Sequence, residues 1–167
     1  MRWRPSAAGR SSDERSGGQS VKVEKTVEVA ATPVEAFAKL SDVKLLATLF
    51  AGFMEWYPTE EPNRFKTIIL AGPAPLGGEV ELEFWPESGM VNWHNTRGVH
   101  QLGRFLIRRS DIGSRVTLRI FYHLDGGIAS RVAERVASFA VSRAAQEALT
   151  RLRRSIEAQP PRTRRAA

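Results

Sequence analysis

Residues 113–157 decide the fold; their sequence is GSRVTLRIFYHL, then DGG, then IASRVAERVASFAVSRAAQEALTRLRRSIE. Between Gly113 and Leu124 apolar and polar residues alternate, which is typical of a strand with one buried face. From Ile128 to about Glu157 there is neither proline nor glycine, and the apolar residues recur at helical spacing: Ile128, Val132, Val136, Phe139, Leu149, Leu152 and Ile156. At ~1.5 Å per residue such a helix is about 45 Å long, so it needs a broad surface to pack against.

The preceding part of the chain supplies that surface as a series of strands. Alternating polarity and intervening turn residues predict strands at residues 21–29, 53–59, 64–71, 78–85, 90–96, 99–109 and 113–124. The clearest alternation places Val80, Leu82 and Phe84 on one face and glutamates on the other. Because the turns between successive strands are short, we expect an antiparallel sheet with one solvent-facing side.

Two short helices are predicted after the first strand. Thr32 and Glu35 form the pattern of a capping box, with Pro33 at the first helical position. Ser41-Asp42 is a second capping signal, which opens a short helix that continues through Leu49. The order of strand, two short helices, further strands and one long helix predicts an α+β protein.

The composition predicts one folded domain with two tails. Residues 1–20 are rich in Ser, Gly and Arg, and residues 159–167 are rich in Pro and Arg, so we expect both to be disordered around a domain at residues 21–158. The mean hydropathy is −0.30, and no apolar run approaches the ~20 residues of a membrane span. The chain has no cysteine and no signal-peptide pattern, which favours a cytoplasmic protein without disulfides or thiolate chemistry.

The net charge of +7 is concentrated in the tails. Residues 1–20 carry +2 and residues 159–167 carry +3, which leaves +2 for the body. Solvated termini of an arginine-rich protein explain this distribution, and arms that contact a ribosome or an anionic surface are the alternative. We therefore predict no specific nucleic-acid binding and no membrane span, and we leave a contact between the tails and an anionic surface open.

Several short patterns resemble one protein family. The residues that carry the resemblance are VEVAATPVEAF at 27–37, Val91-Asn92-Trp93, Gly98, Gly103, Phe105, residues 115–118, Tyr122, and LTRLRRSIE at 149–157. Together with the order of elements, they make residues 21–157 similar to the SRPBCC superfamily. This superfamily includes START proteins, birch-pollen-allergen-like proteins and polyketide cyclases/dehydrases.

The resemblance implies both a fold and a class of function. The fold is the helix-grip fold, in which an antiparallel sheet of about seven strands wraps around the long C-terminal helix and encloses an apolar cavity. Family members bind lipids, isoprenoids or polyketides, and a minority catalyse cyclisation or dehydration without a cofactor. We therefore expect transport or sensing of a hydrophobic small molecule, with a polyketide-type cyclase/dehydratase or a protein- or ribosome-interaction module as alternatives.

The phase of the strands and the helix predicts which side chains meet the ligand. These are Val80, Leu82, Phe84, Trp93, Asn95, Gln101, Phe105, Leu118, Ile120 and Tyr122 on strands, and Val136, Phe139 and Ala140 on the helix. Gln101 and Tyr122 are polar residues on an apolar face, so they either orient a polar group of the ligand or bond to each other or to the backbone. Asn95 is expected at the rim. Helix alanines such as Ala140 either leave room for a ligand or let aromatic side chains pack closely.

The sequence contains no strong catalytic pattern. His94, His100 and His123 lack metal-ligand spacing, and neither a phosphate-binding glycine motif nor a nucleophile elbow is found, so we expect no metal and no cofactor. Tyr122 and His94 are candidate general acids only if they line the cavity. Whether the protein is an enzyme is left open, and binding is favoured over catalysis.

Two further segments have more than one interpretation. The arginines of the last helix, among them Arg143 and Arg151, are interpreted as a solvated face paired with Glu147, and a basic membrane-surface helix is the alternative. The loop at residues 72–78 is rich in proline and glycine and is a candidate lid over the cavity.

Overall fold

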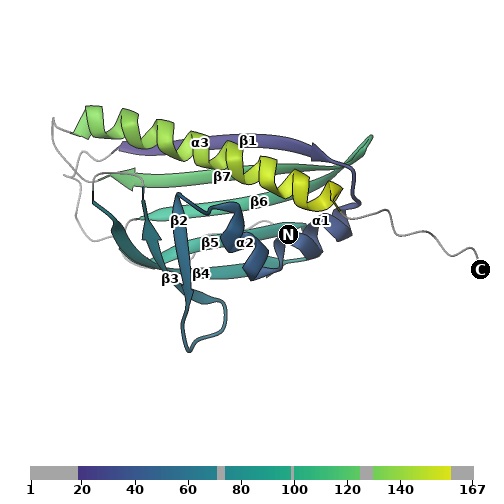
Figure 1. Ribbon diagram of the computed structural model, residues 1–167, viewed down its shortest axis with the longest axis horizontal. Helices are drawn as coiled ribbons and strands as arrows, with labels where there is room; N and C mark the ends of the chain where they lie inside the picture. The colour runs from purple at the N-terminus through teal and green to yellow at the C-terminus, as the bar shows by residue number, and fades with distance from the viewer. Residues whose placement is uncertain (1–18, 71–73, 99, 125–129, 159–167) are drawn as a thin grey trace, which may run out of the picture.

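A computed structural model describes the protein over residues 19–70, 74–98, 100–124 and 130–158. The described chain forms seven strands and three helices, as Figure 1 shows. In chain order they are β1 (Gln19–Val29), α1 (Pro33–Leu40), α2 (Val43–Leu49), β2 (Met54–Pro58), β3 (Arg64–Ile69), β4 (Leu76–Trp85), β5 (Met90–Arg97), β6 (Gln101–Ser110), β7 (Gly113–Leu124) and α3 (Ser130–Glu157).

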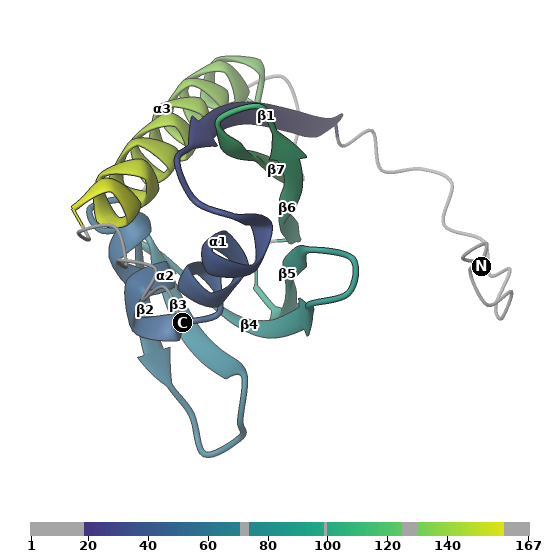
Figure 2. The ribbon, with the colours of Figure 1, turned by 90° about the vertical axis from the view of Figure 1, so that its right-hand side faces the viewer.

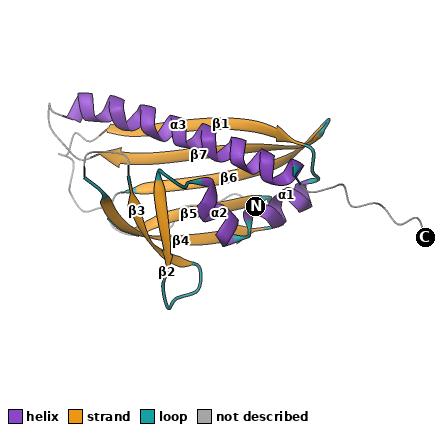
Figure 3. Cartoon of the chain, in the orientation of Figure 1, coloured by secondary structure: helices purple, strands orange, loops and turns teal. Residues whose placement is uncertain are grey.

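The strands form one antiparallel sheet in the order β1-β7-β6-β5-β4-β3-β2. The first strand therefore pairs with the last, and β2 to β7 follow one another as a meander. The sheet curls strongly, so that its concave side faces all three helices (Figures 2 and 3). The predicted helix-grip fold is confirmed: a curved antiparallel sheet holds the long C-terminal helix.

The two short helices begin where their capping residues predict. The backbone N–H of Thr32 donates to Glu35 Oε2 at 2.9 Å, and Glu35 N–H donates to Thr32 Oγ1 at 3.3 Å, which completes the capping box of α1. Asp42 caps α2 by accepting from Lys44 N–H at 2.9 Å. Ser41 closes α1 and is not part of the second start signal.

Several element boundaries differ from the prediction. β1 begins at Gln19, so two residues assigned to the N-terminal tail belong to the sheet. β4 begins at Leu76, which places the end of the predicted lid loop in a strand, while residues 71–73 lie outside the described part of the chain. The remaining tail residues, 1–18 and 159–167, also lie outside it.

An arginine of α3 forms hydrogen bonds to the end of α2, although the sequence pattern predicts a solvated position for it. Arg151 Nη1 donates to the backbone oxygens of Leu49 at 2.8 Å and Ala51 at 2.9 Å. These carbonyls lie at the C-terminal end of α2, where backbone oxygens have no partner within the helix. The predicted pairing with Glu147 is also present, with Arg143 Nε at 2.8 Å and Arg151 Nη2 at 3.6 Å from its carboxylate.

Candidate functional site

The concave face of the sheet is largely apolar. The strand register places Leu82 opposite Trp93, Trp93 opposite Gly103, and Gly103 opposite Ile120, so these positions share one face. The predicted ligand-contacting residues Val80, Leu82, Trp93, Phe105, Leu118 and Ile120 are buried there, and Phe84 is half-buried. Their contact with a ligand stays a prediction.

An aromatic cluster fills the middle of the space between the sheet and the helices. Trp93 lies edge-on to Phe50 of the α2–β2 connection with ring centroids 5.5 Å apart, and its ring is 5.7 Å from that of Phe105. All three side chains are at most 1% exposed. At this level the small residues of the interior serve close packing, since a Cβ on Gly103 would lie 1.9 Å from the Trp93 ring.

A row of polar groups crosses the concave face beside this cluster. Gln101 of β6 pairs with Tyr122 of β7, and both are buried. Continuing the β5–β6 register places Asn95 opposite Gln101, and Trp56 of β2 pairs with Thr67 of β3 on the same face. We call Trp56, Thr67, Asn95, Gln101 and Tyr122 the polar band.

The polar band lies at one end of the sheet. Tyr122 pairs with Val21 near the start of β1, whereas α1 follows the other end of that strand. Figures 1 and 2 show α1 across that opposite end of the space beneath α3. The polar band is thus at the end where β5 and β7 finish and α3 begins.

Several polar atoms of this region are buried and have no hydrogen-bond partner within the described chain. They are Trp56 Nε1, Thr67 Oγ1, Trp93 Nε1 and Asn95 Oδ1. Thr67 is 2% exposed and Trp93 is fully buried, so solvent does not satisfy them from the surface. Leaving such a group unpaired costs about 1–3 kcal/mol, which singles out this part of the interior as a candidate binding site.

Trp56 and Thr67 are site residues that the sequence analysis missed. The sequence pattern could have identified Thr67, because Phe65, Thr67 and Ile69 occupy alternate positions of one strand and the threonine interrupts an apolar face. The absence of a partner for its hydroxyl depends on neighbours from other strands, which no local pattern reveals.

The electrostatic environment of the concave face is neutral. The buried polar residues of the described chain are Thr67, Asn92, Gln101 and Ser114, and none of these side chains is charged. Among the described residues, clear pKa shifts occur at exposed groups away from this face. Hydrogen bonds from Arg119 and Lys22 lower the pKa of Glu24, a hydrogen bond from Arg143 lowers that of Glu147, and the bond to Glu55 raises that of Tyr57.

Two helix residues predicted to contact the ligand are largely exposed to solvent. Val136 is 58% exposed and Phe139 is 71% exposed, whereas Ala140 is half-buried. The buried stripe of the described helix consists of Val141, Ala144, Ala145, Ala148, Leu149, Leu152 and Ile156. Because successive residues turn by about 100°, Phe139 lies nearly opposite Val141, so it cannot belong to the face that packs on the sheet.

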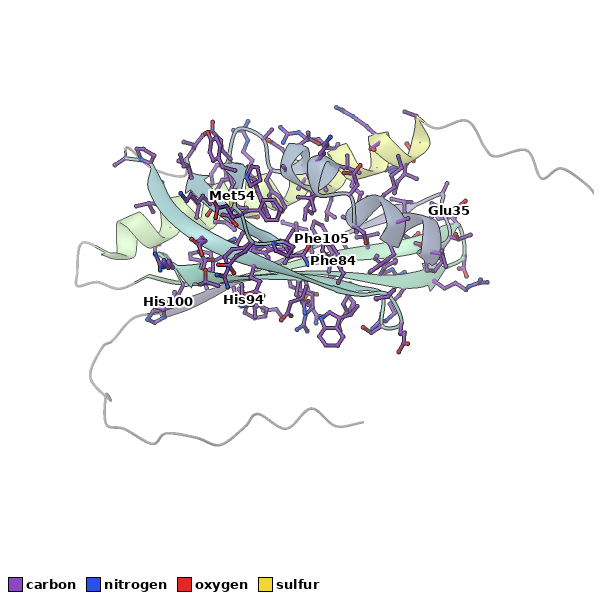
Figure 4. All side chains as sticks on the ribbon, turned by 90° about the horizontal axis from the view of Figure 1, so that it is seen from below. Glu35, Met54, Phe84, His94, His100 and Phe105 are labelled. Carbon is purple, nitrogen blue, oxygen red and sulfur yellow. The ribbon has the colours of Figure 1, made fainter. Side chains whose placement is uncertain are left out.

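The histidines do not form a site. His94 lies on the convex face, since it alternates with Trp93 along β5, and its Nε2 is 4.0 Å from Glu81 Oε2. Figure 4 shows it on the other side of the sheet from Phe105, so its suggested role as a general acid in the cavity is wrong. His100 is exposed, and within the described residues no group of His, Cys, Asp or Glu could hold a metal ion.

Two grooves lined by described residues lie away from the polar band. One, of about 390 Å3, is bounded by Pro33, Val34, Phe37, Pro86, Ile107 and Arg109 between α1 and the β4–β5 turn. The other, of about 530 Å3, lies around Arg64 at the β2–β3 turn, where that side chain pairs with Glu61 at 2.6 Å. In the described chain no helix is both long and apolar enough to span a membrane.

Comparisons with known proteins agree with this architecture. Residues 20–157 match the sequence profile of the family described as polyketide cyclase / dehydrase and lipid transport. No curated protein sequence matches the chain.

Solved structures show the same fold at low sequence identity. TTHA0849 from Thermus thermophilus is similar with a TM-score of 0.67 and 17% identity, over 84% of this chain and 98% of that one. The Zhui aromatase/cyclase from Streptomyces sp. R1128 gives 0.68 and 16%, over 83% and 94%. A START superfamily protein from Mycobacterium smegmatis gives 0.60 and 15%, over 81% and 97%. At these identities the likeness concerns the fold alone.

Proposed function

Since the chain belongs to the polyketide cyclase / dehydrase and lipid transport family, we propose that it binds a largely apolar small molecule for transport or sensing. The molecule lies between the concave face of the sheet and α3, at the end that carries the polar band. Its apolar body contacts buried residues such as Ile120 and Val80, and its polar end contacts the polar band.

One observation carries this proposal: buried polar atoms without a partner in the described chain gather on an otherwise apolar concave face. Trp56 Nε1, Thr67 Oγ1 and Asn95 Oδ1 come from three strands of the same face. A ligand that bonds to them removes a penalty of about 1–3 kcal/mol per atom, and its apolar part gains about 25 cal/mol per Å2 of buried surface. Ordered water is the competing partner for these atoms.

The aromatic cluster limits where the ligand lies. Trp93, Phe50 and Phe105 occupy the middle of the interior, so the ligand extends from the polar band toward the start of α3 and does not run the whole length of the helix. This position keeps it next to the strand ends at Arg97, Gln101 and Leu124 and away from the aromatic cluster.

Neighbouring glycines of β4 offer a matched test. A Cβ on Gly78 would lie 3.2 Å from Asn95 Nδ2 and 3.3 Å from Thr67 Oγ1, whereas a Cβ on Gly77 meets nothing within 4 Å. The purified protein, Gly78→Ala and Gly77→Ala are each passed through a cellular lipid extract, and retained molecules are identified by mass spectrometry against an albumin control. We expect the wild type and Gly77→Ala to retain the same compound and Gly78→Ala to retain less. Retention no higher than the albumin background in the wild type would contradict the proposal.

A catalytic role is the second candidate, and the position of Tyr122 favours it. This tyrosine is 6% exposed and lies on the concave face opposite Gln101, so its hydroxyl is directed into the interior and is shielded from bulk solvent. A buried phenol beside an amide can donate a proton to a carbonyl during cyclisation or dehydration. Tyr122→Phe should then abolish turnover of a polyketide substrate while binding is kept, and an unchanged rate would remove Tyr122 from the mechanism.

A further inference from the structure

Building on the proposed binding function, we infer that the ligand presents an uncharged hydroxyl, enol or hydroxy-ketone group to Thr67 and Asn95. We further infer that the site discriminates against carboxylates and phosphates. We call Thr67, Gly78 and Asn95 the Gly78 notch. The inference concerns the class of ligand, which the fold and the family leave open.

The notch is formed by two side chains that converge over a glycine. Thr67 of β3 pairs with Gly78 of β4, and Asn95 of β5 reaches the same glycine from the other side, next to the irregular register between Glu79 and Val80. Thr67 Oγ1 and Asn95 Nδ2 lie 3.3 Å and 3.2 Å from the position of a Gly78 Cβ. The same Cβ would lie 3.1 Å from the backbone oxygen of Arg97, so even alanine would require its neighbours, the two polar side chains among them, to shift by a few tenths of an ångström.

The orientation of the Asn95 amide determines what the notch can recognise. Its Nδ2 donates to the backbone oxygen of Arg97 at 3.3 Å, which leaves Oδ1 buried as an acceptor without a partner in the described chain. An indole N–H, such as that of Trp56, can only donate, and a hydroxyl such as that of Thr67 can do both. The complementary ligand group therefore donates to Asn95 and accepts from Thr67 or an indole, which a hydroxyl does and an ionised carboxylate does not.

The distribution of charged side chains also favours an uncharged ligand group. The buried residues of the described chain include no charged side chain, so a carboxylate or phosphate at the notch would have no buried cation to pair with. The Arg97 side chain, two positions beyond Asn95, is exposed. An unpaired anion in such surroundings loses most of its hydration without compensation, and the Asn95 Oδ1 acceptor repels it further.

Three probes with the same carbon frame separate these properties. They are 2-naphthol, which is an uncharged hydroxyl compound, 2-naphthoate, which is an anion at neutral pH, and naphthalene. Binding is followed by the indole N–H signals of Trp56 and Trp93 in 15N-labelled protein, which are assigned with single Trp→Phe variants. We expect 2-naphthol to bind roughly fivefold more tightly than naphthalene, in line with one net hydrogen bond, and 2-naphthoate more weakly than either.

A conservative variant tests the notch itself. Thr67→Val keeps the shape of the side chain and removes a hydroxyl that has no partner in the described chain. In the ligand-free protein the urea midpoint should therefore stay the same or rise, and the preference for 2-naphthol over naphthalene should fall. Thr117→Val is the control, because Thr117 Oγ1 is on the convex face, 3.0 Å from Thr26 Oγ1. It should lower the urea midpoint slightly and leave the preference unchanged.

The outcomes distinguish this inference from the function on which it rests. Equal binding of all three probes, or strongest binding of 2-naphthoate, overturns the inference and leaves a hydrophobic binding site. If none of the probes binds, the compound retained from the lipid extract tests the inference instead. An uncharged hydroxyl compound supports it, and a carboxylate or phosphate overturns it. Retention of no compound overturns the binding function as well. A marked fall in the urea midpoint of Thr67→Val also overturns it, because the hydroxyl would then have a partner within the protein.

Discussion

Replacing Gly103 with alanine should destabilise the protein through Trp93. A Cβ on Gly103 would lie 1.9 Å from both Cε2 and Cζ2 of the indole, against the ~3.5–4.0 Å that two carbon atoms need. The ring must therefore move by nearly 2 Å. Trp93 is fully buried and is 5.5 Å from Phe50, 5.7 Å from Phe105 and 6.5 Å from Trp56 between ring centroids, so it cannot move without displacing these rings.

The expected magnitude follows from two opposing terms. Overpacking a close-packed core by forced side-chain movement costs about 1–3 kcal/mol, and this site belongs at the upper end because the neighbours are large and buried. Alanine in a strand regains roughly 0.5–1 kcal/mol through the lower entropy of the unfolded chain. We expect a net loss of about 2 kcal/mol in the free energy of unfolding, measured by urea denaturation with far-ultraviolet circular dichroism.

A double-mutant cycle identifies the cause. In the Trp93→Leu background the ring is gone, so Gly103→Ala should be neutral or slightly stabilising. Gly77→Ala is the matched control, because that glycine is also in a strand but has no neighbour within 4 Å of the new methyl group. A clash with Trp93 is excluded if Gly103→Ala changes the free energy of unfolding by less than about 0.5 kcal/mol, or if its cost is the same with and without the Trp93 ring.

Two further predictions concern the surface of the sheet and the attachment of α3. Glu24 accepts from Arg119 Nε at 2.6 Å, and its pKa is lowered, so the ionised carboxylate stabilises the fold above its ordinary pKa of 4.5. This effect is lost as the pH falls below 4.5 through the lower folded value, so the stability difference between wild type and Glu24→Gln should shrink over that range, and a constant difference would contradict this. Arg151→Met should lower the free energy of unfolding by about 1–2 kcal/mol in urea, because it removes the bonds to Leu49 and Ala51, although the side chain is 39% exposed. Arg143→Met is the control and should cost only ~0.5 kcal/mol or less. Equal losses would mean that the bonds to α2 contribute nothing.

Local patterns of the sequence were sufficient to predict the elements and an α+β protein, whereas the helix-grip fold was implied by the resemblance to a known family. Alternation identified all the strands because one face of the sheet is buried and the other is solvated, as in residues 80–85. Thr32 and Asp42 located the helix starts because their side chains satisfy backbone N–H groups that have no other partner. These features depend only on neighbours a few residues away.

The docking face of α3 was predicted only in part. Leu149, Leu152 and Ile156 of the predicted apolar pattern are buried, whereas Val136 and Phe139 are exposed. Between these two groups the helix packs mainly through Ala144, Ala145 and Ala148. Small residues let a helix approach a sheet closely, and their weak hydrophobicity hides the face they form. Arg151 was misassigned for a related reason, since its partners belong to α2 and become neighbours only in the folded chain.

The candidate site was predicted in part. Gln101, Asn95 and Tyr122 were singled out as polar residues on an apolar face, and the structure places them in adjacent strands of that face. Thr67 and Trp56 joined them only once the register of β2 and β3 was known. Strand phase finds inward-facing residues, but the pairing of strands far apart in the sequence decides which of them meet.

The position of the ligand is best determined from a structure of the protein in complex with the compound that it retains from the lipid extract. We expect this compound to lie against the concave face, with an uncharged oxygen within about 3.2 Å of Asn95 Oδ1 or Thr67 Oγ1. A compound bound instead in the groove between α1 and the β4–β5 turn, or a charged group seated over Gly78, would contradict this expectation.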